Sequence, residues 1–310
     1  MKLPSDPLLS AIGSINASYR DNEVGLSANN PAVLQEGLSS KINTSFNNFI
    51  GGIKAYSLTG ALQNEHTKTM FGAHIYFVDY GNISQTDAAG NVLGSFRPVD
   101  YVVQVSAARK YLERWNYGVA VKLIGSKYQQ FKSAAVAFDF GLIYEDSANH
   151  ITAGILAKNM GIQIKSYGGN MEDLPFDIQI GITKKLANAP LAFSITAQHI
   201  HQFNILYNDS TINGNNLSGT GFFNKLFNHL VIASHIYISQ NLELNIGYNQ
   251  LRRSELSLGT SNNGLAGFSA GFRVIFQKIE ILYTRTTYQK NISYNHFGLE
   301  IPLHQFFSSL

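Results

Sequence analysis

From about residue 40 onward the chain repeats one pattern: some ten residues in which apolar and polar side chains alternate, followed by a turn. Residues 242–249 are typical, with leucine, isoleucine and tyrosine at every second position and glutamate, asparagine or glycine between them. A period of two places the two sets of side chains on opposite faces of a β-strand. Strands of ~9–11 residues are also what a tilted membrane crossing needs. The pattern therefore predicts an all-β protein whose strands have one apolar and one polar face.

Fourteen segments carry the alternation, and an even number returns both ends of a barrel wall to the same side of a membrane. The expected strands are 40–49, 52–62, 68–79, 98–111, 115–127, 133–145, 150–160, 175–186, 190–206, 227–239, 241–251, 265–277, 279–289 and 292–303. We therefore predict a fourteen-stranded antiparallel transmembrane β-barrel over residues 40–305.

The connections between these segments differ in length according to their parity. Every even-numbered connection is short, whereas the long ones, at 80–97, 161–174, 207–226 and 252–264, are all odd-numbered. Bacterial outer-membrane barrels have this asymmetry, with tight periplasmic turns and longer external loops. We therefore expect an outer-membrane protein whose long loops face the cell exterior and whose termini lie in the periplasm. A soluble two-layer β protein is the weaker alternative.

Composition narrows the possible partners. Charged residues are 14% of the chain, against about a quarter in a typical soluble domain. The net charge of +3 comes from scattered lysines and arginines, which argues against nucleic acid and leaves a mild attraction to lipid or to anionic lipopolysaccharide. Absence of cysteine excludes disulfides and thiolate chemistry. No apolar stretch follows Lys2, so any export signal is expected to have been removed or to lie upstream of Met1.

Residues 1–39 lack the alternation and are predicted to form a separate plug segment. A barrel of this width cannot fill its lumen with wall side chains alone. The segment carries Arg20, Asp21 and Glu23, and charges buried in the lumen need partners of opposite sign. The candidate partners are Lys122, Arg273 and Glu280. We interpret these plug charges as a fixed staple in preference to a gate; a disordered tail is the alternative for the whole segment.

A run of Asn29, Asn30, Pro31 and Ala32 just before the first strand resembles the plug of the FadL-like outer-membrane proteins. Further short motifs resemble the PorV/PorQ branch of that family, which belongs to the type IX secretion system. These motifs are Leu3-Pro4-Ser5, Ala11-Ile12-Gly13, Tyr80-Gly81, Gly90-Asn91, Leu174-Pro175-Phe176 and Lys184-Lys185-Leu186.

The resemblance implies a non-enzymatic barrel of the cell-surface attachment complex. Its partners would be a PorZ-like surface protein, which it tethers, together with PorU- and PorV-type members. The candidate partner-binding residues in external loops are Asp87, Gly90, Asn91, Phe96, Asn213, Phe222 and Phe223. The rival hypothesis is a FadL-like channel for the uptake of hydrophobic small molecules.

Two sequence patterns resemble those of catalytic or metal-binding sites. Residues 267–271 fit the Gly-x-Ser-x-Gly pattern of a nucleophile elbow, but a β alternation follows where that motif needs a helix. His199 and His201 lie two apart on one predicted strand, as metal ligands can, yet no third ligand is recognisable in the sequence. We therefore predict no catalytic, cofactor-binding or metal-binding residues, and interpret both histidines as polar wall residues.

Overall fold

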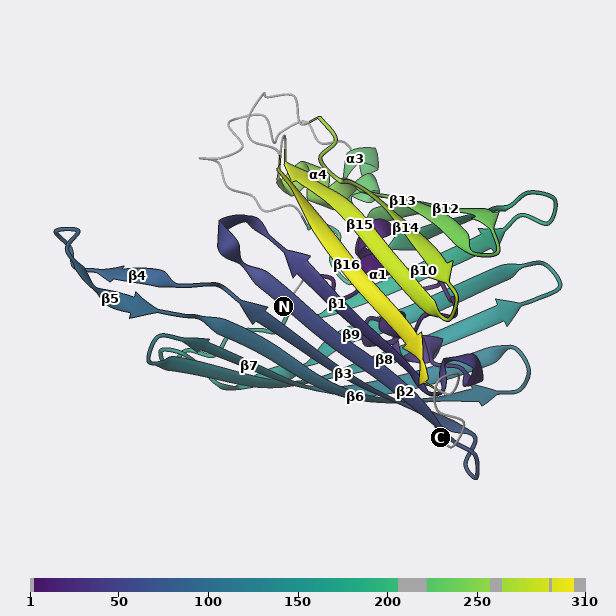
Figure 1. The fold of residues 1–310 in the computed structure, drawn as a ribbon, viewed down its shortest axis with the longest axis horizontal. Coiled ribbons are helices and arrows are strands. Elements are labelled where there is room, and N and C mark those ends of the chain that lie inside the picture. Colours follow the sequence, from purple (N-terminus) through teal and green to yellow (C-terminus); the bar gives the residue numbers. More distant parts are fainter. Residues whose placement is uncertain (1–2, 206–221, 257–263, 290–291, 304–310) are drawn as a thin grey trace.

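A computed structural model describes residues 3–205, 222–256, 264–289 and 292–303 of the chain. Fourteen strands form a closed antiparallel barrel in which each strand pairs with its sequence neighbours and the last strand returns to pair with the first (Figure 1). This closure confirms the predicted fold class. It also leaves the wall without a free sheet edge, which is the condition for crossing lipid with strands.

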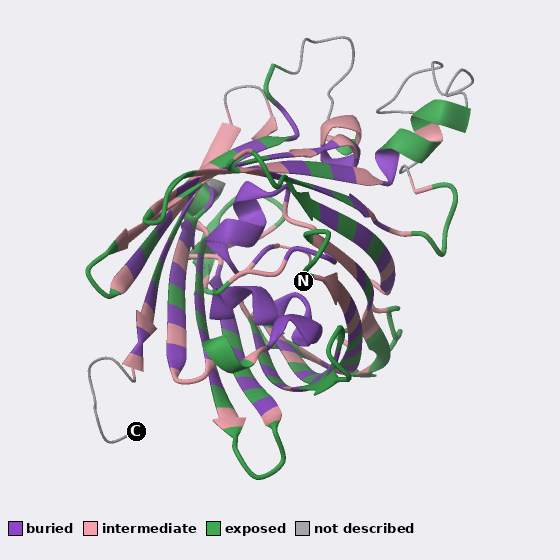
Figure 2. Ribbon diagram, turned by 90° about the vertical axis from the view of Figure 1, so that its right-hand side faces the viewer, coloured by how far each residue is buried: buried purple, intermediate pink, exposed green. Residues whose placement is uncertain are grey.

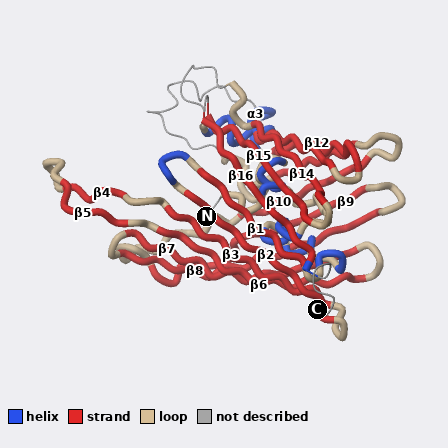
Figure 3. Tube along the Cα trace, viewed as in Figure 1, coloured by secondary structure: helices blue, strands red, loops and turns tan. Residues whose placement is uncertain are grey.

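The bounds of the elements are close to the expected ranges over most of the wall (Figure 3). The strands are β1 Lys41–Asn48, β2 Lys54–Asn64, β3 Thr69–Asp79, β4 Ile83–Thr86, β5 Val92–Phe96, β6 Val99–Tyr111, β7 Trp115–Tyr128, β8 Phe131–Asp146, β9 Ile151–Lys165, β10 Asp177–Lys185, β11 Leu191–Ala197, β12 Leu230–Ser239, β13 Leu242–Asn249, β14 Phe268–Phe276, β15 Ile279–Gln289 and β16 Ile292–Pro302. The helices are α1 Pro7–Ala11, α3 Phe222–Asn228 and α4 Gln250–Glu255, with short 3₁₀ turns η1 Val24–Ala28, η2 Pro31–Val33, η3 Glu36–Leu38 and η4 Ile50–Gly52.

The two faces of the wall have opposite chemistry, visible as alternating bands along each strand in Figure 2. Exposed apolar side chains on the outside include Leu58, Ile75, Val105, Val119, Leu123, Ile182, Ile195 and Phe297. Buried polar side chains on the inside include Asn43, Ser57, Thr59, Gln104, Ser194, Asn245 and Thr284. Apolar side chains outside and polar ones inside are the reverse of a soluble barrel, so the outer surface is suited to lipid.

Several predicted boundaries are wrong. The strand expected at 150–160 continues to Lys165, and the strand expected at 227–239 begins only at Leu230, after helix α3. The connection expected at 80–97 contains a hairpin, β4–β5, that projects from the barrel (Figure 1). The strand expected at 190–206 ends at Ala197, and the strand expected at 241–251 gives way to helix α4 after Asn249. In the last case Asn249 caps the helix, because its side chain accepts a hydrogen bond from the backbone N–H of Arg252. Among the described residues no helix is long and apolar enough to span a membrane.

The residues before β1 lie inside the barrel as a series of short turns (Figure 2). Helix α1 packs against β13 to β16, and η2 packs against β6, β7 and β8. The segment contributes much of the buried apolar core, including Leu8, Leu9, Ile12, Val24, Leu34 and Leu38. Burial of these side chains in a polar-walled lumen provides the apolar contacts that the wall itself lacks.

Glycines on the inner face of the wall allow the segment to approach closely. A Cβ atom at Gly118 would lie 2.5 Å from the carbonyl carbon of Pro31. At Gly154 it would lie 2.0 Å from the carbonyl oxygen of Ala17. These contacts are with backbone atoms, so at such positions any other residue would displace the lumenal segment.

Candidate functional site

A chain of ion pairs joins the lumenal segment to the wall. Asp21 lies 2.9 Å from Arg273, whose guanidinium also pairs with Glu243 at 2.6 Å and with Glu280 at 3.4 Å. Lys41 continues the chain, 3.2 Å from Glu280 and 2.7 Å from Glu300. Arg273 is one of the predicted partners of the plug charges, and it pairs with Asp21.

The second charge of the same turn, Arg20, pairs with Glu145 at 2.7 Å. Together with the Asp21–Arg273 pair, this contact ties one turn of the lumenal segment to two separate parts of the wall. The arrangement suits a fixed attachment, and the distinction between staple and gate stays an interpretation.

Among the described residues Glu23 forms no ion pair, and its side chain faces another carboxyl group. Its Oε1 accepts a hydrogen bond of 3.2 Å from Asn43, and its other oxygen faces the carboxyl group of Asp6. Burial raises the pKa of both carboxyl groups, and the proximity of Asp6 raises the pKa of Glu23 further. Both effects favour a protonated carboxyl group, and two buried carboxyl groups that face each other can share one proton.

The four residues of the predicted plug motif have structural contacts. The side chain of Asn30 caps η2 by accepting from the N–H of Ala32 at 3.0 Å, and it donates to the carbonyl of Ala17 at 2.9 Å. Pro31 stands at the first position of the turn, where a proline needs no N–H partner. Asn29 donates to the carbonyl of Asn16 at 2.8 Å. The motif therefore folds the segment back on itself.

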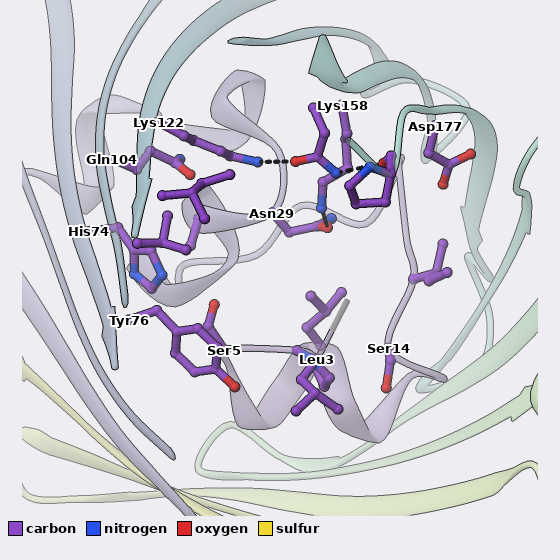
Figure 4. A pocket seen from close by; sticks show the side chains of 18 of the residues that line it. Leu3, Ser5, Ser14, Asn29, His74, Tyr76, Gln104, Lys122, Lys158 and Asp177 are labelled. Atoms are coloured by element: carbon purple, nitrogen blue, oxygen red, sulfur yellow. Dashed lines mark hydrogen bonds between the residues drawn. The ribbon is translucent and has the colours of Figure 1, made fainter. Parts of the chain in front are cut away.

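Asn29 also forms part of a cavity between the lumenal segment and the wall. Its Oδ1 accepts a hydrogen bond of 2.6 Å from Lys158, as Figure 4 shows. The cavity has a volume of about 160 Å³. Its apolar lining is Leu3, Leu9, Ile15, Val102 and Ile124, and its polar lining includes Asn29, His74, Gln104, Lys122, Lys158, Asp177 and His199.

The wall beside this cavity is interrupted at Asn159. This residue has a positive φ of 57° and lies where the register between β8 and β9 shifts. Its N–H donates to Asp139 at 2.8 Å and its side-chain amide donates to the carbonyl of Pro175 at 2.9 Å, while Lys122 donates to its Oδ1 at 3.2 Å. This β-bulge changes the direction of β9, and the side chain of Asn159 holds the segment before β10 in place.

Beyond the bulge, β9 continues to Lys165 whereas its partner β10 begins only at Asp177, opposite Lys158. A recess of about 630 Å³ lies at this step in the wall. Its lining is Asn159, Met160, Gly161, Asp173, Leu174, Pro175, Phe176, His199, His201 and Gln202. Asn159, Pro175 and His199 line both the recess and the lumenal cavity, so the two spaces border the same three residues.

The two histidines proposed as neighbours on a strand lie instead in a turn after β11, so their assignment to a strand is wrong. The third ligand that could not be recognised in the sequence is supplied by Asp177, which lies beside both. One ligand atom from each of Asp177, His199 and His201 lies within 4.8 Å of the others. Sequence reasoning missed Asp177 because it lies 22 residues earlier and is brought across by the β10–β11 pairing.

The candidate partner-binding residues lie at two places. Asp87, Gly90 and Asn91 form the tip of the β4–β5 hairpin, where Asp87 accepts hydrogen bonds from the N–H groups of Ala89 and Asn91. Phe96 ends β5 and its ring packs against Tyr128 at 5.0 Å. The other place is α3, where Phe222 and Phe223 are exposed; Asn213 lies outside the described residues.

The serine of the Gly-x-Ser-x-Gly pattern lies within β14. The Ser269 hydroxyl donates to the carbonyl of Ala11 in the lumenal segment at 2.8 Å. It therefore serves as another attachment point between wall and segment.

Comparison with known proteins gives a likeness of fold. No family model and no curated protein sequence matches the chain. Among known structures, a mutant of the TodX monoaromatic hydrocarbon channel has a TM-score of 0.58 at 9% identity, covering 95% of this chain and 96% of TodX. The CymD monoaromatic hydrocarbon channel gives 0.55 at 11%, covering 95% of each chain, and a Pseudomonas aeruginosa FadL homologue gives 0.52 at 10%, covering 96% and 97%. The fold is a FadL-like fourteen-stranded barrel.

Proposed function

We propose that the protein is a bacterial outer-membrane channel for small, mainly apolar molecules, with its long loops at the cell exterior. The observation that carries the proposal is that the lumenal cavity and the wall recess border the same residues, Asn159, Pro175 and His199. Movement of these residues would open the side route that we propose from the wall into the lumen. The proteins of similar fold, TodX and CymD, are channels for monoaromatic hydrocarbons.

The size and lining of the cavity suggest the class of solute. A volume of about 160 Å³ is close to that of protein cavities that bind benzene. The charged ends of the two lysines in the lining are engaged by protein groups: Lys158 by Asn29, and Lys122 by Asn159 and Asp139. Leu3, Leu9 and Ile15 then offer an apolar surface to a ligand of one ring.

Uptake by whole cells tests the proposal. The full chain is expressed in a bacterial host without a hydrocarbon channel, and entry of radiolabelled toluene and of a long-chain fatty acid is measured. Val102 is buried and lines the cavity, whereas Val103 is its exposed neighbour on the same strand. Val102→Trp fills the cavity and should abolish the accelerated uptake, and Val103→Trp is the matched control that should leave it intact. Equal entry with and without the protein would refute the channel.

A second proposal is that the barrel anchors a PorZ-like surface protein in a type IX secretion system, beside PorU- and PorV-type members. The projecting β4–β5 hairpin favours it, because Val92 and Leu93 are 69% and 64% exposed there. Exposed apolar side chains on a projecting element commonly mark a protein-binding surface.

Co-purification distinguishes the anchor from the channel. A PorZ-like protein should be isolated with the full chain and lost with a Val92→Asn, Leu93→Asn double variant, which leaves the cavity untouched. If the partner co-purifies equally with both proteins, or with neither, the hairpin is not the anchor.

A further inference from the structure

Asp177, His199 and His201 come together through the pairing of β10 with β11. In that register Ile180 lies opposite Ala197. Continuing the antiparallel count places Asp177 opposite residue 200, and the N–H of Ile200 does donate to the carbonyl of Ile178 at 3.2 Å. Asp177 is thereby flanked across the hairpin by the two histidines.

The geometry approaches that of a metal site. Nδ1 of His199 lies 3.2 Å from Oδ1 of Asp177. Two ligands held about 2.0–2.2 Å from a tetrahedral Zn²⁺ ion lie roughly 3.3 Å apart, so this pair is already correctly spaced. A ligand nitrogen of His201 lies within 4.8 Å of a ligand atom of each of the other two residues, so the His201 side chain has to move closer when an ion binds. His201 is exposed, which leaves room for this movement.

Neighbouring groups hold the three side chains in position. The amide of Gln179 donates to the other carboxylate oxygen of Asp177 at 2.6 Å, and the N–H of His199 donates to its Oδ1 at 2.7 Å. His199 has a φ of 52°, a backbone conformation that non-glycine residues adopt uncommonly. The His201 ring packs on Phe176 with centroids 4.9 Å apart. Orientation of ligands by such contacts is characteristic of metal sites in proteins.

The donor set selects the class of ion. Two imidazoles and one carboxylate suit Zn²⁺ and related transition metals, whereas Ca²⁺ and Mg²⁺ prefer shells made of oxygen alone. Three protein ligands leave a coordination position for water, and the exposure of His201 makes the site reachable from the wall recess.

We infer that Asp177, His199 and His201 form a binding site for a Zn²⁺-class ion between the lumenal cavity and the wall recess. The bound ion connects the start of β10 to the turn after β11. Its binding does not require that any solute passes through the barrel.

Competition with a zinc-chelating dye tests the site. The full chain, purified in detergent without a polyhistidine tag, is titrated with Zn²⁺, and one ion per chain is expected. His201→Gln removes an exposed ligand without disturbing the core and should weaken binding by about 10–100-fold or more, since loss of a residue that merely orients a ligand already costs that much. His66→Gln, in the exposed turn after β2, is the matched control and should bind like the unaltered chain.

Two further measurements complete the test. X-ray absorption of the zinc-loaded protein should show two imidazole nitrogens among the nearest atoms, and Zn²⁺ should raise the unfolding temperature of the unaltered chain but not of His201→Gln. Absence of binding in the unaltered chain, equal affinity in His201→Gln, or preference for Ca²⁺ would each overturn the site.

Discussion

Replacement of Gly118 by alanine is the sharpest perturbation of the contact between the wall and the lumenal segment. The added Cβ would lie 2.5 Å from the carbonyl carbon of Pro31 and 2.6 Å from the backbone nitrogen of Ala32. Both are backbone atoms, so η2 must move away from β7. On that strand Asn116 donates to the carbonyls of Ala32 at 2.6 Å and Leu34 at 2.8 Å, and the displacement breaks at least one of these buried hydrogen bonds.

The cost follows from two terms. Overpacking a filled interior destabilises by about 1–3 kcal/mol. Loss of a buried hydrogen bond adds ~1 kcal/mol. The segment should therefore detach from the wall more easily by roughly 2–4 kcal/mol, while the barrel itself, whose strand hydrogen bonds are unaffected, stays closed.

Hydrogen exchange measures this directly. The N–H of Val33 donates to the carbonyl of Asn30 within η2 and should exchange roughly 30- to 700-fold faster in Gly118→Ala, since each 1.4 kcal/mol is a factor of ten. Gly60→Ala is the control, because its Cβ would meet nothing closer than 3.6 Å. Unchanged exchange at Val33, or equal acceleration in both variants, would refute the close packing of segment and wall.

Two further outcomes are expected. Burial raises the pKa values of Asp6 and Glu23 above their ordinary 3.8 and 4.5, so the stability that their protonated forms contribute is complete below those ordinary values and is lost as the pH rises through the raised ones. Urea unfolding should therefore show a lower free energy of unfolding at pH 8 than at pH 5, and Glu23→Gln should reduce this pH dependence. A free energy of unfolding that increases with pH would contradict the shared proton. Asn159→Ala removes the hydrogen bond to the carbonyl of Pro175 and should speed proteolysis in the segment before β10. The free energy of unfolding of the barrel should fall by only ~1–2 kcal/mol. An unchanged cleavage rate would show that Asn159 does not hold this segment.

The sequence predicted the wall well because alternation is a local property. In residues 242–249 every second side chain is apolar, and the structure places them as one strand of a closed barrel. The same rule failed over 190–206, where the expected strand stops at Ala197. There Asp177 takes the N–H of His199, a contact with a residue 22 positions away that a local pattern does not encode.

The interior was harder to predict for the same reason. In the sequence, Gly118 and Gly154 only predict reduced strand stability. Their role becomes clear from the backbone of the lumenal segment, which packs directly on both. Only pairing of distant strands brings Asn159, Pro175 and His199 to one place. Charge gave more guidance, since Asp21 inside the lumen required a cation and Arg273 was among the predicted partners.

Closure of the barrel by its first and last strands has a consequence for biogenesis. Every residue from Lys41 to Glu300 must have been synthesised before these two can meet across the β1–β16 junction. Helix α1 packs against β13 to β16, so its surroundings are complete only when the last strands have arrived, whereas η2 can pack against β6 to β8 earlier. Truncation of the last strand should leave a sheet with two unpaired edges, which are prone to pair with other chains.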